Sequence, residues 1–246
     1  MKEKNRVEKI IRVGLFLIIL ALIGYALNAG AFQFILDNPG DLIFLGGQHL
    51  KMVAISSAAA IMVAVPLGIF ITRPQFKKFE FLVVNFANIG QTVPSIAILA
   101  LVMSYMGLGW QTAVFALWFS SLLPILRNTV AGIYSVPPAI IDAGKGMGMT
   151  QKQILLKLEL PNASYAILAG IRTATVINVG TAALAFLIGG GGLGDLIFTG
   201  ISLYDTGIML AGAIPIILLA VTIDFLLGGV EKIITPKGLQ RKLETI

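Results

Sequence analysis

The chain contains 246 residues, of which 57% are hydrophobic and only 12% are charged. Soluble globular proteins are about half apolar and about a quarter charged, so this composition argues against a soluble enzyme or a nucleic-acid-binding protein. The net charge of +6 comes from basic residues dispersed along the chain, and we expect no nucleic-acid partner. The absence of cysteine and the single histidine, His49, exclude disulfides and thiolate or all-histidine metal sites, so we expect no metal.

Apolar runs that are almost free of charge predict an all-α, polytopic membrane protein with about six transmembrane helices. The predicted spans cover residues 13–28, 52–72, 81–106, 111–126, 163–188 and 207–229. The first span has a second interpretation. Its basic start, its apolar run and the small residues Ala29-Gly30-Ala31 also fit a cleaved signal peptide.

Basic residues predict the orientation of the spans. Nearly all of the 18 lysines and arginines lie in the N-terminal segment, in the second-to-third and fourth-to-fifth connections and in the tail. Because cytoplasmic loops collect Lys and Arg, we expect a multi-pass protein of the cytoplasmic membrane with both termini in the cytoplasm. The opposite loops carry aspartates, including Asp195 and Asp205.

Three segments are expected along the chain. Residues 1–48 hold the N-terminal cytoplasmic segment, the first span and an outer loop. Residues 49–229 form the core with five spans, including a cytoplasmic loop at 133–161, and residues 230–246 form a cytoplasmic tail. A long polar loop between spans usually has a function.

The first half of the 133–161 loop is predicted to be a short helix and a turn. Pro137 and Pro138 can start a helix over 139–145, since proline is tolerated in the first turn. Gly146 and Gly148 then permit a tight turn.

The second half is predicted to be another helix, over 151–159, with Thr150 as its N-cap. Ile154 and Leu158 fall on one apolar face, and Pro161 is expected to end the helix. Two helices joined by a glycine turn form a compact projection that can enter a groove on a partner.

The loop resembles the "EAA" loop of permease subunits of bacterial ABC importers. That pattern has an acidic-Ala-Ala triplet, a glycine four residues after the triplet and an apolar-x-Leu-Pro ending, all at the spacing found here. Three residues depart from it: Asp142 replaces Glu, Gly144 replaces Ala and Leu158 replaces Ile. The residues that the resemblance assigns to ATPase coupling are Asp142, Ala143, Gly144, Gly148, Met149, Thr150, Leu160 and Pro161.

The resemblance implies the fold and the partners of a type I importer. Two ABC ATPase subunits would bind ATP and Mg²⁺, a second permease copy or a paralogous permease would complete the pore, and an extracytoplasmic binding protein would deliver the solute. This chain itself would need no cofactor. It contains no G-x-x-x-x-G-K-[ST] sequence, so we expect a transporter subunit and not an enzyme that hydrolyses ATP.

Further motifs resemble the osmoprotectant permeases, which import glycine betaine, carnitine, choline or proline betaine. The similarity covers about 49–227, and its motifs lie at 91–95, 123–129, 146–150, 170–174 and 190–195. These motifs indicate the subfamily better than the substrate, because the binding protein usually selects the solute. Another trimethylammonium compound or an amino acid remains an alternative.

Polar groups within spans suggest residues of the translocation path. Such groups are costly in a bilayer and usually face protein or water. Gln91 and Ser95 flank Pro94 in the third span, and Asn178 and Thr181 lie three residues apart in the fifth. We predict that these four residues contact the path; the alternative is that they hydrogen-bond between helices.

Arg172 and Asp224 are the charges expected within spans. They could form a structural ion pair between the fifth and sixth helices, or each could extend to the membrane interface.

Two other classes of membrane protein would need features of their own. An ion-coupled secondary transporter would be expected to carry paired intramembrane carboxylates or broken repeats. An intramembrane serine protease would need a nucleophile and a base, and His49 is accompanied by no G-x-S-x-G sequence.

Overall fold

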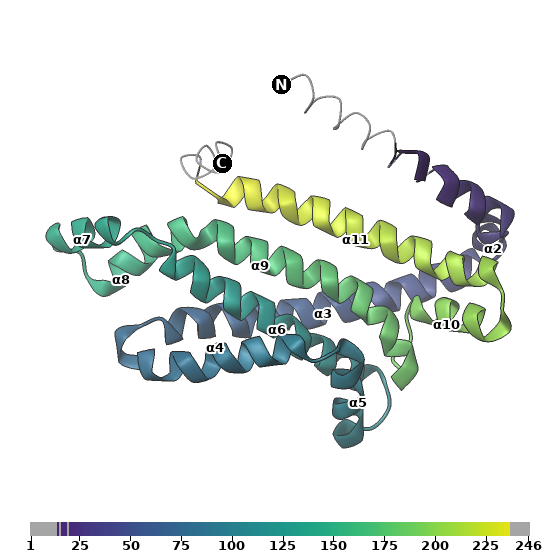
Figure 1. Ribbon diagram of the computed structural model, residues 1–246, viewed down its shortest axis with the longest axis horizontal. Coiled ribbons are helices and arrows are strands. Elements are labelled where there is room, and N and C mark those ends of the chain that lie inside the picture. The colour runs from purple at the N-terminus through teal and green to yellow at the C-terminus, as the bar shows by residue number, and fades with distance from the viewer. Residues whose placement is uncertain (1–13, 15, 19, 237–246) are drawn as a thin grey trace.

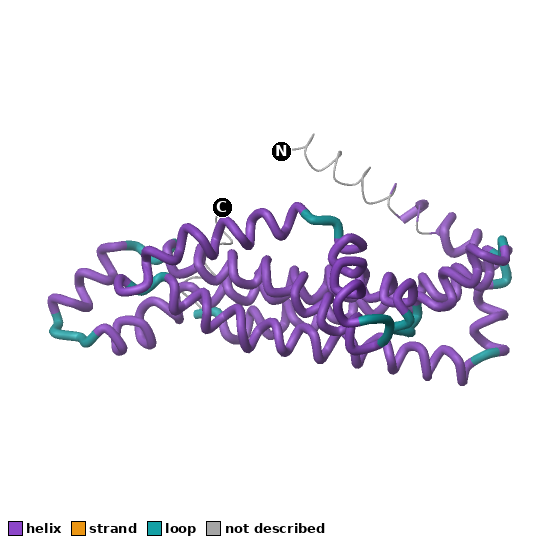
Figure 2. Tube along the Cα trace, turned by 90° about the horizontal axis from the view of Figure 1, so that it is seen from below, coloured by secondary structure: helices purple, strands orange, loops and turns teal. Residues whose placement is uncertain are grey.

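The computed structural model describes residues 14, 16–18 and 20–236 as a long bundle of helices joined by short connections (Figure 1). The described residues contain no strand (Figure 2), which confirms the all-α prediction. Parts of the predicted N-terminal segment and of the tail, residues 1–13 and 237–246, lie outside the described residues.

The helices follow one another along the whole described chain. A first helical stretch covers Phe16–Asn28. After it come α2 (Ala31–Asp37), α3 (Pro39–Ile71), α4 (Lys77–Thr92), α5 (Ser95–Met106), α6 (Trp110–Tyr134), α7 (Pro138–Gly146), α8 (Gln151–Ile154), α9 (Leu160–Thr181), α10 (Gly194–Leu203) and α11 (Thr206–Ile234). Three short helices link them: η1 (Pro74–Phe76) and η3 (Ala182–Ile188) are 3₁₀-helices, and η2 (Leu155–Glu159) is a π-helix.

Four of these helices are individually long and apolar enough to cross a membrane. They are Pro39–Ile71, Trp110–Tyr134, Gln151–Ile188 and Thr206–Ile234. Each extends beyond the predicted apolar run at one end or at both. Two bent pairs bring the number of candidate spans to six, in agreement with the prediction.

The predicted third span, residues 81–106, is bent at its proline. The pair Pro74–Thr92 and Ser95–Met106 bends by 105° at Val93 and Pro94. Pro94 has no N–H to donate and holds the preceding residue in the extended region, where Val93 has φ −75° and ψ 124°. The stretch Phe16–Asn28 lies within the predicted first span, and a bend of 57° follows it, between Phe16–Asn28 and α2.

The bundle is closely packed where α6 meets α3 and α9. Gly68 of α3 lies against Thr129, and Gly170 of α9 lies against Asn128, so glycines face larger residues of α6 at both contacts. Small residues allow membrane helices to approach closely where no hydrophobic effect drives them together. The buried apolar residues that line these contacts include Ala60, Ala64, Ile125, Leu126 and Ala174.

The two ends of the bundle differ. α7 and α8 lie at one end, and α2 and α10 lie at the other (Figure 1). The turn between α5 and α6 is tied to the end of η3 by a hydrogen bond of 2.7 Å from the Gly109 amide to the Ile188 carbonyl. At the other end, the connection between α6 and α9 projects beyond the neighbouring α3–α4 turn (Figure 1).

Candidate functional site

The first half of the 133–161 loop folds as predicted. The expected helix over 139–145 is α7, with Pro138 in its first turn. Gly148 has a φ of +73°, so it supplies the turn that L-residues rarely adopt. Gly146 instead ends α7 without a positive φ.

Thr150 is the N-cap of α8, as predicted. Its hydroxyl accepts a hydrogen bond from the Gln153 amide at 3.3 Å, and the Gln153 side chain accepts one from the Thr150 amide at 2.8 Å. This reciprocal pair is a capping box. It satisfies the backbone N–H groups of Thr150 and Gln153 at the start of α8.

The absence of a side chain at Gly144 allows the two helices of the loop to pack closely. A Cβ on this buried glycine would lie 2.6 Å from Leu158 Cδ1 and 3.5 Å from Ile154 Cγ1. Two of the three departures from the family pattern, Gly144 for Ala and Leu158 for Ile, are therefore in contact. The side chain lost from α7 leaves the room that Leu158 occupies.

The helix that begins at α8 does not end at Pro161, contrary to the prediction. It runs from Gln151 to Ile188 as one 38-residue segment. Pro161 would clash with the carbonyl four residues earlier in a regular α-helix. The π-helical turn Leu155–Glu159 shifts the hydrogen bonding just before it, so the helix passes the proline.

The outer surface of the loop carries both charged and apolar residues. Asp142 and Lys145 form an exposed ion pair of 3.1 Å, and Ala143 is also exposed. Met147, which the sequence did not single out as a site residue, is 72% exposed between the two helices. A flexible, exposed methionine is suited to contact with an apolar groove on a partner. Its position between Gly146 and Gly148 is the sequence feature that could have indicated its exposure.

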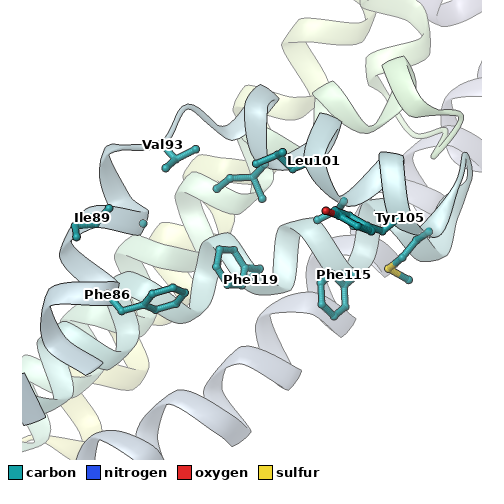
Figure 3. A pocket seen from close by; sticks show the side chains of 11 residues that line it. Phe86, Ile89, Val93, Leu101, Tyr105, Phe115 and Phe119 are labelled. Atoms are coloured by element: carbon teal, nitrogen blue, oxygen red, sulfur yellow. The ribbon is translucent and has the colours of Figure 1, made fainter. Parts of the chain in front are cut away.

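The bend between α4 and α5 opens a groove against α6 (Figure 3). Its volume is about 550 Å³, and its walls are apolar, including Phe86, Leu101, Tyr105 and Phe119. Gln91 is exposed and Ser95 is half-buried, one on each side of the bend. The groove lies on the surface of the subunit and is not a channel through its core.

Asn178 and Thr181, the other two predicted path residues, lie on α9. Asn178 is buried and donates hydrogen bonds to Ser56 at 2.8 Å and Ser57 at 3.1 Å, both on α3. Thr181 donates to the Ile177 carbonyl within its own helix. Among the described residues no hydrogen bond joins this pair to Gln91 or Ser95. In this conformation Asn178 hydrogen-bonds to a neighbouring helix, which is the predicted alternative to a contact with the translocation path.

Arg172 and Asp224 form an ion pair between α9 and α11. The Arg172 guanidinium donates to both carboxylate oxygens of Asp224, at 2.6 and 2.7 Å. It also donates to Glu231 at 3.3 Å, a partner that the sequence had not suggested. Gly228 leaves room for the guanidinium, since a Cβ there would lie 3.1 Å from it.

A helical membrane subunit with a projecting α7–α8 loop is the architecture of a transport permease, and comparison with known proteins establishes the family. Residues 64–236 match the model of the binding-protein-dependent transport system inner membrane component. The chain belongs to this family, whose members are ABC transporter permeases and not enzymes. Family membership sets aside the secondary transporter and the intramembrane protease.

Several curated relatives cover most of the chain. The glycine betaine/carnitine/choline transport system permease protein OpuCB of Bacillus subtilis is 46% identical over 207 residues, which are 84% of this chain and 94% of the relative. The choline transport system permease protein OpuBB of the same organism is 44% identical, covering 86% and 97%. The osmoprotectant import permease protein OsmY of Salmonella typhimurium is 43% identical, covering 91% and 95%.

Solved structures confirm the type I importer fold. The inward-facing methionine ABC transporter MetNI superposes with a TM-score of 0.72 at 23% identity, covering 80% of this chain and 97% of that one. An amino acid ABC transporter solved with histidines superposes with a TM-score of 0.69 at 16% identity, covering 82% and 97%. Both similarities concern the fold alone.

Proposed function

We propose that this chain is the membrane-spanning subunit of an ATP-driven importer for quaternary ammonium osmoprotectants. Relatives that match over more than four fifths of the chain carry glycine betaine, carnitine or choline in their names. The shared chemistry of these solutes is a trimethylammonium group. An importer for another small solute is the second candidate, because a binding protein can select the substrate.

The observation that carries the coupling role is the projecting loop itself. Its two short helices are fixed to each other by the contact of Gly144 with Leu158 and by the capping box at Thr150. A rigid projection of this size can be displaced as a unit, as switching between two states requires. Residues 139–161 dock on one of two ATPase subunits, which bind ATP and Mg²⁺ and undergo ATP-driven closure.

The translocation path lies between this subunit and a second permease copy or a paralogous permease. The close packing of α3, α6 and α9 and the concave apolar surface at the α4–α5 bend support a path on the surface of the subunit. The loop end of the bundle and both termini face the cytoplasm. An extracytoplasmic binding protein delivers solute at the opposite end, near α2 and α10.

Reconstitution tests this function. The chain would be co-expressed with the ATPase and the binding protein encoded with it, and the complex placed in proteoliposomes. We expect ATP-dependent uptake of radiolabelled glycine betaine, carnitine or choline that requires the binding protein. Uptake by the chain alone, or uptake of only an unrelated amino acid by the full complex, would contradict the proposal.

A further inference from the structure

The side chain of Arg73 links the helix bundle to the 133–161 loop. Arg73 lies two residues after the end of α3 and is the N-cap of η1, the short turn that leads into α4. Its Nη1 lies 2.6 Å from Glu159 Oε2, at the end of the π-helical turn of the loop. The two side chains are 19% and 14% exposed, so the pair is largely shielded from water. Breaking such a pair leaves an uncompensated charge.

The other nitrogens of Arg73 are fixed to α3. Nε donates to the Ile69 carbonyl at 3.2 Å, and Nη2 donates to the Thr72 hydroxyl at 3.0 Å. A cation at the C-terminus of a helix is favoured by the helix dipole. The guanidinium is therefore held in place on the α3 side and presents one nitrogen to Glu159. Arginine can bridge two elements in this way because its planar head carries several donors.

A cavity separates the two elements that Arg73 joins. Its volume is about 520 Å³, and it lies between the α3–α4 turn and the loop, with Lys77, Tyr134 and Asp142 among its lining residues. The turn and α7 are thus not closely packed across this space. The ion pair at its wall is a direct link by which movement of the loop can reach the turn.

A second polar contact lies beside the cavity. Tyr134, the last residue of α6, donates a hydrogen bond of 2.5 Å to Glu80 of α4. The start of α4 is thus connected to the loop at two points. Arg73, just before η1 and α4, pairs with Glu159, and Glu80 in the first turn of α4 accepts the hydrogen bond from Tyr134. α4 runs from this point to the 105° bend at Pro94, which Gln91 and Ser95 flank.

We propose that Arg73 is a positioning residue that transmits displacement of the 133–161 loop, through Glu159, to α4 and the bent α4–α5 span. The inference rests on the proposed function, because it assumes that an ATPase displaces the loop. It adds a second route from loop to membrane, besides the covalent continuation of the loop into α9.

The test uses the full complex in proteoliposomes and measures solute transported per ATP hydrolysed. Glu159→Gln removes one charge with little change in shape, and Arg73→Gln removes the other. Coupling free energies between sites typically correspond to roughly 5- to 150-fold effects, and we expect either variant to lower the ratio about tenfold while retaining ATPase activity and copurification of the ATPase. Lys78→Gln, which removes a neighbouring exposed charge, should leave the ratio unchanged.

A charge-swapped double variant, Arg73→Glu with Glu159→Arg, should regain part of the lost ratio. Unchanged ratios in both single variants would overturn the inference. So would single variants that lose transport and ATP hydrolysis in equal proportion together with thermal stability, because that pattern indicates a merely structural role. If Arg73→Gln fails to assemble, Glu159→Gln decides the outcome. A wild-type complex that does not transport would contradict the proposed function instead.

Discussion

Gly144 shows how one residue sets the shape of the loop. A methyl group at this position would lie 2.6 Å from Leu158 Cδ1, closer than van der Waals contact. Overpacking of this kind costs about 1–3 kcal/mol, against a gain of up to about 1 kcal/mol in helix propensity for alanine. We expect Gly144→Ala to separate α7 from the following helix and to reduce the amount of ATPase that copurifies.

Leu158→Val provides the matched control for this prediction, because it removes the δ-carbons that the new methyl group would meet. The double variant should recover more ATPase than Gly144→Ala alone, a non-additive result expected for residues in contact. Full recovery of ATPase with Gly144→Ala alone would show that the two helices tolerate a larger separation.

At the scale of elements, the contact of α6 with α9 depends on Gly170. A Cβ there would overlap Asn128 Cβ, and Asn128 is itself held by a hydrogen bond of 2.8 Å to the Pro124 carbonyl. Gly180 lies on the same helix with no atom within 4 Å of its added Cβ. We expect Gly170→Ala to destabilise the subunit by about 1–3 kcal/mol and Gly180→Ala to be neutral or slightly stabilising. Thermal unfolding in detergent measures both, and equal effects would contradict the close approach.

At the scale of the whole molecule, the position of the loop predicts which end of the bundle is cytoplasmic. The chain has no cysteine, so single cysteines can be labelled without background. Lys145 is exposed on α7, and Ser202 is exposed on α10 at the opposite end (Figure 1). In intact spheroplasts, we expect an impermeant maleimide to label Ser202→Cys and to label Lys145→Cys only after lysis. The reverse pattern would invert the orientation.

The sequence by itself determined the class of this protein. The thickness of the bilayer sets the length of each apolar run, so these runs can be recognised in the sequence without knowing how the helices pack. Local chemistry also sufficed for the loop as far as the cap at Thr150. Prolines at 137 and 138, Gly148 and the Thr150 cap act on their own backbone or on residues a few positions away. None of these features depends on contacts between distant elements.

Tertiary structure decided the relations between elements. The bond of Asn178 to Ser56 spans 122 positions, and the ion pair of Arg73 with Glu159 joins two separate connections. Neither pairing has a sequence period that could reveal it. The π-helical turn before Pro161 was likewise hidden, because the proline alone indicates a helix end. Which surface carries the path depends on how the helices pack, since a polar residue such as Asn178 serves equally well between helices or beside a solute.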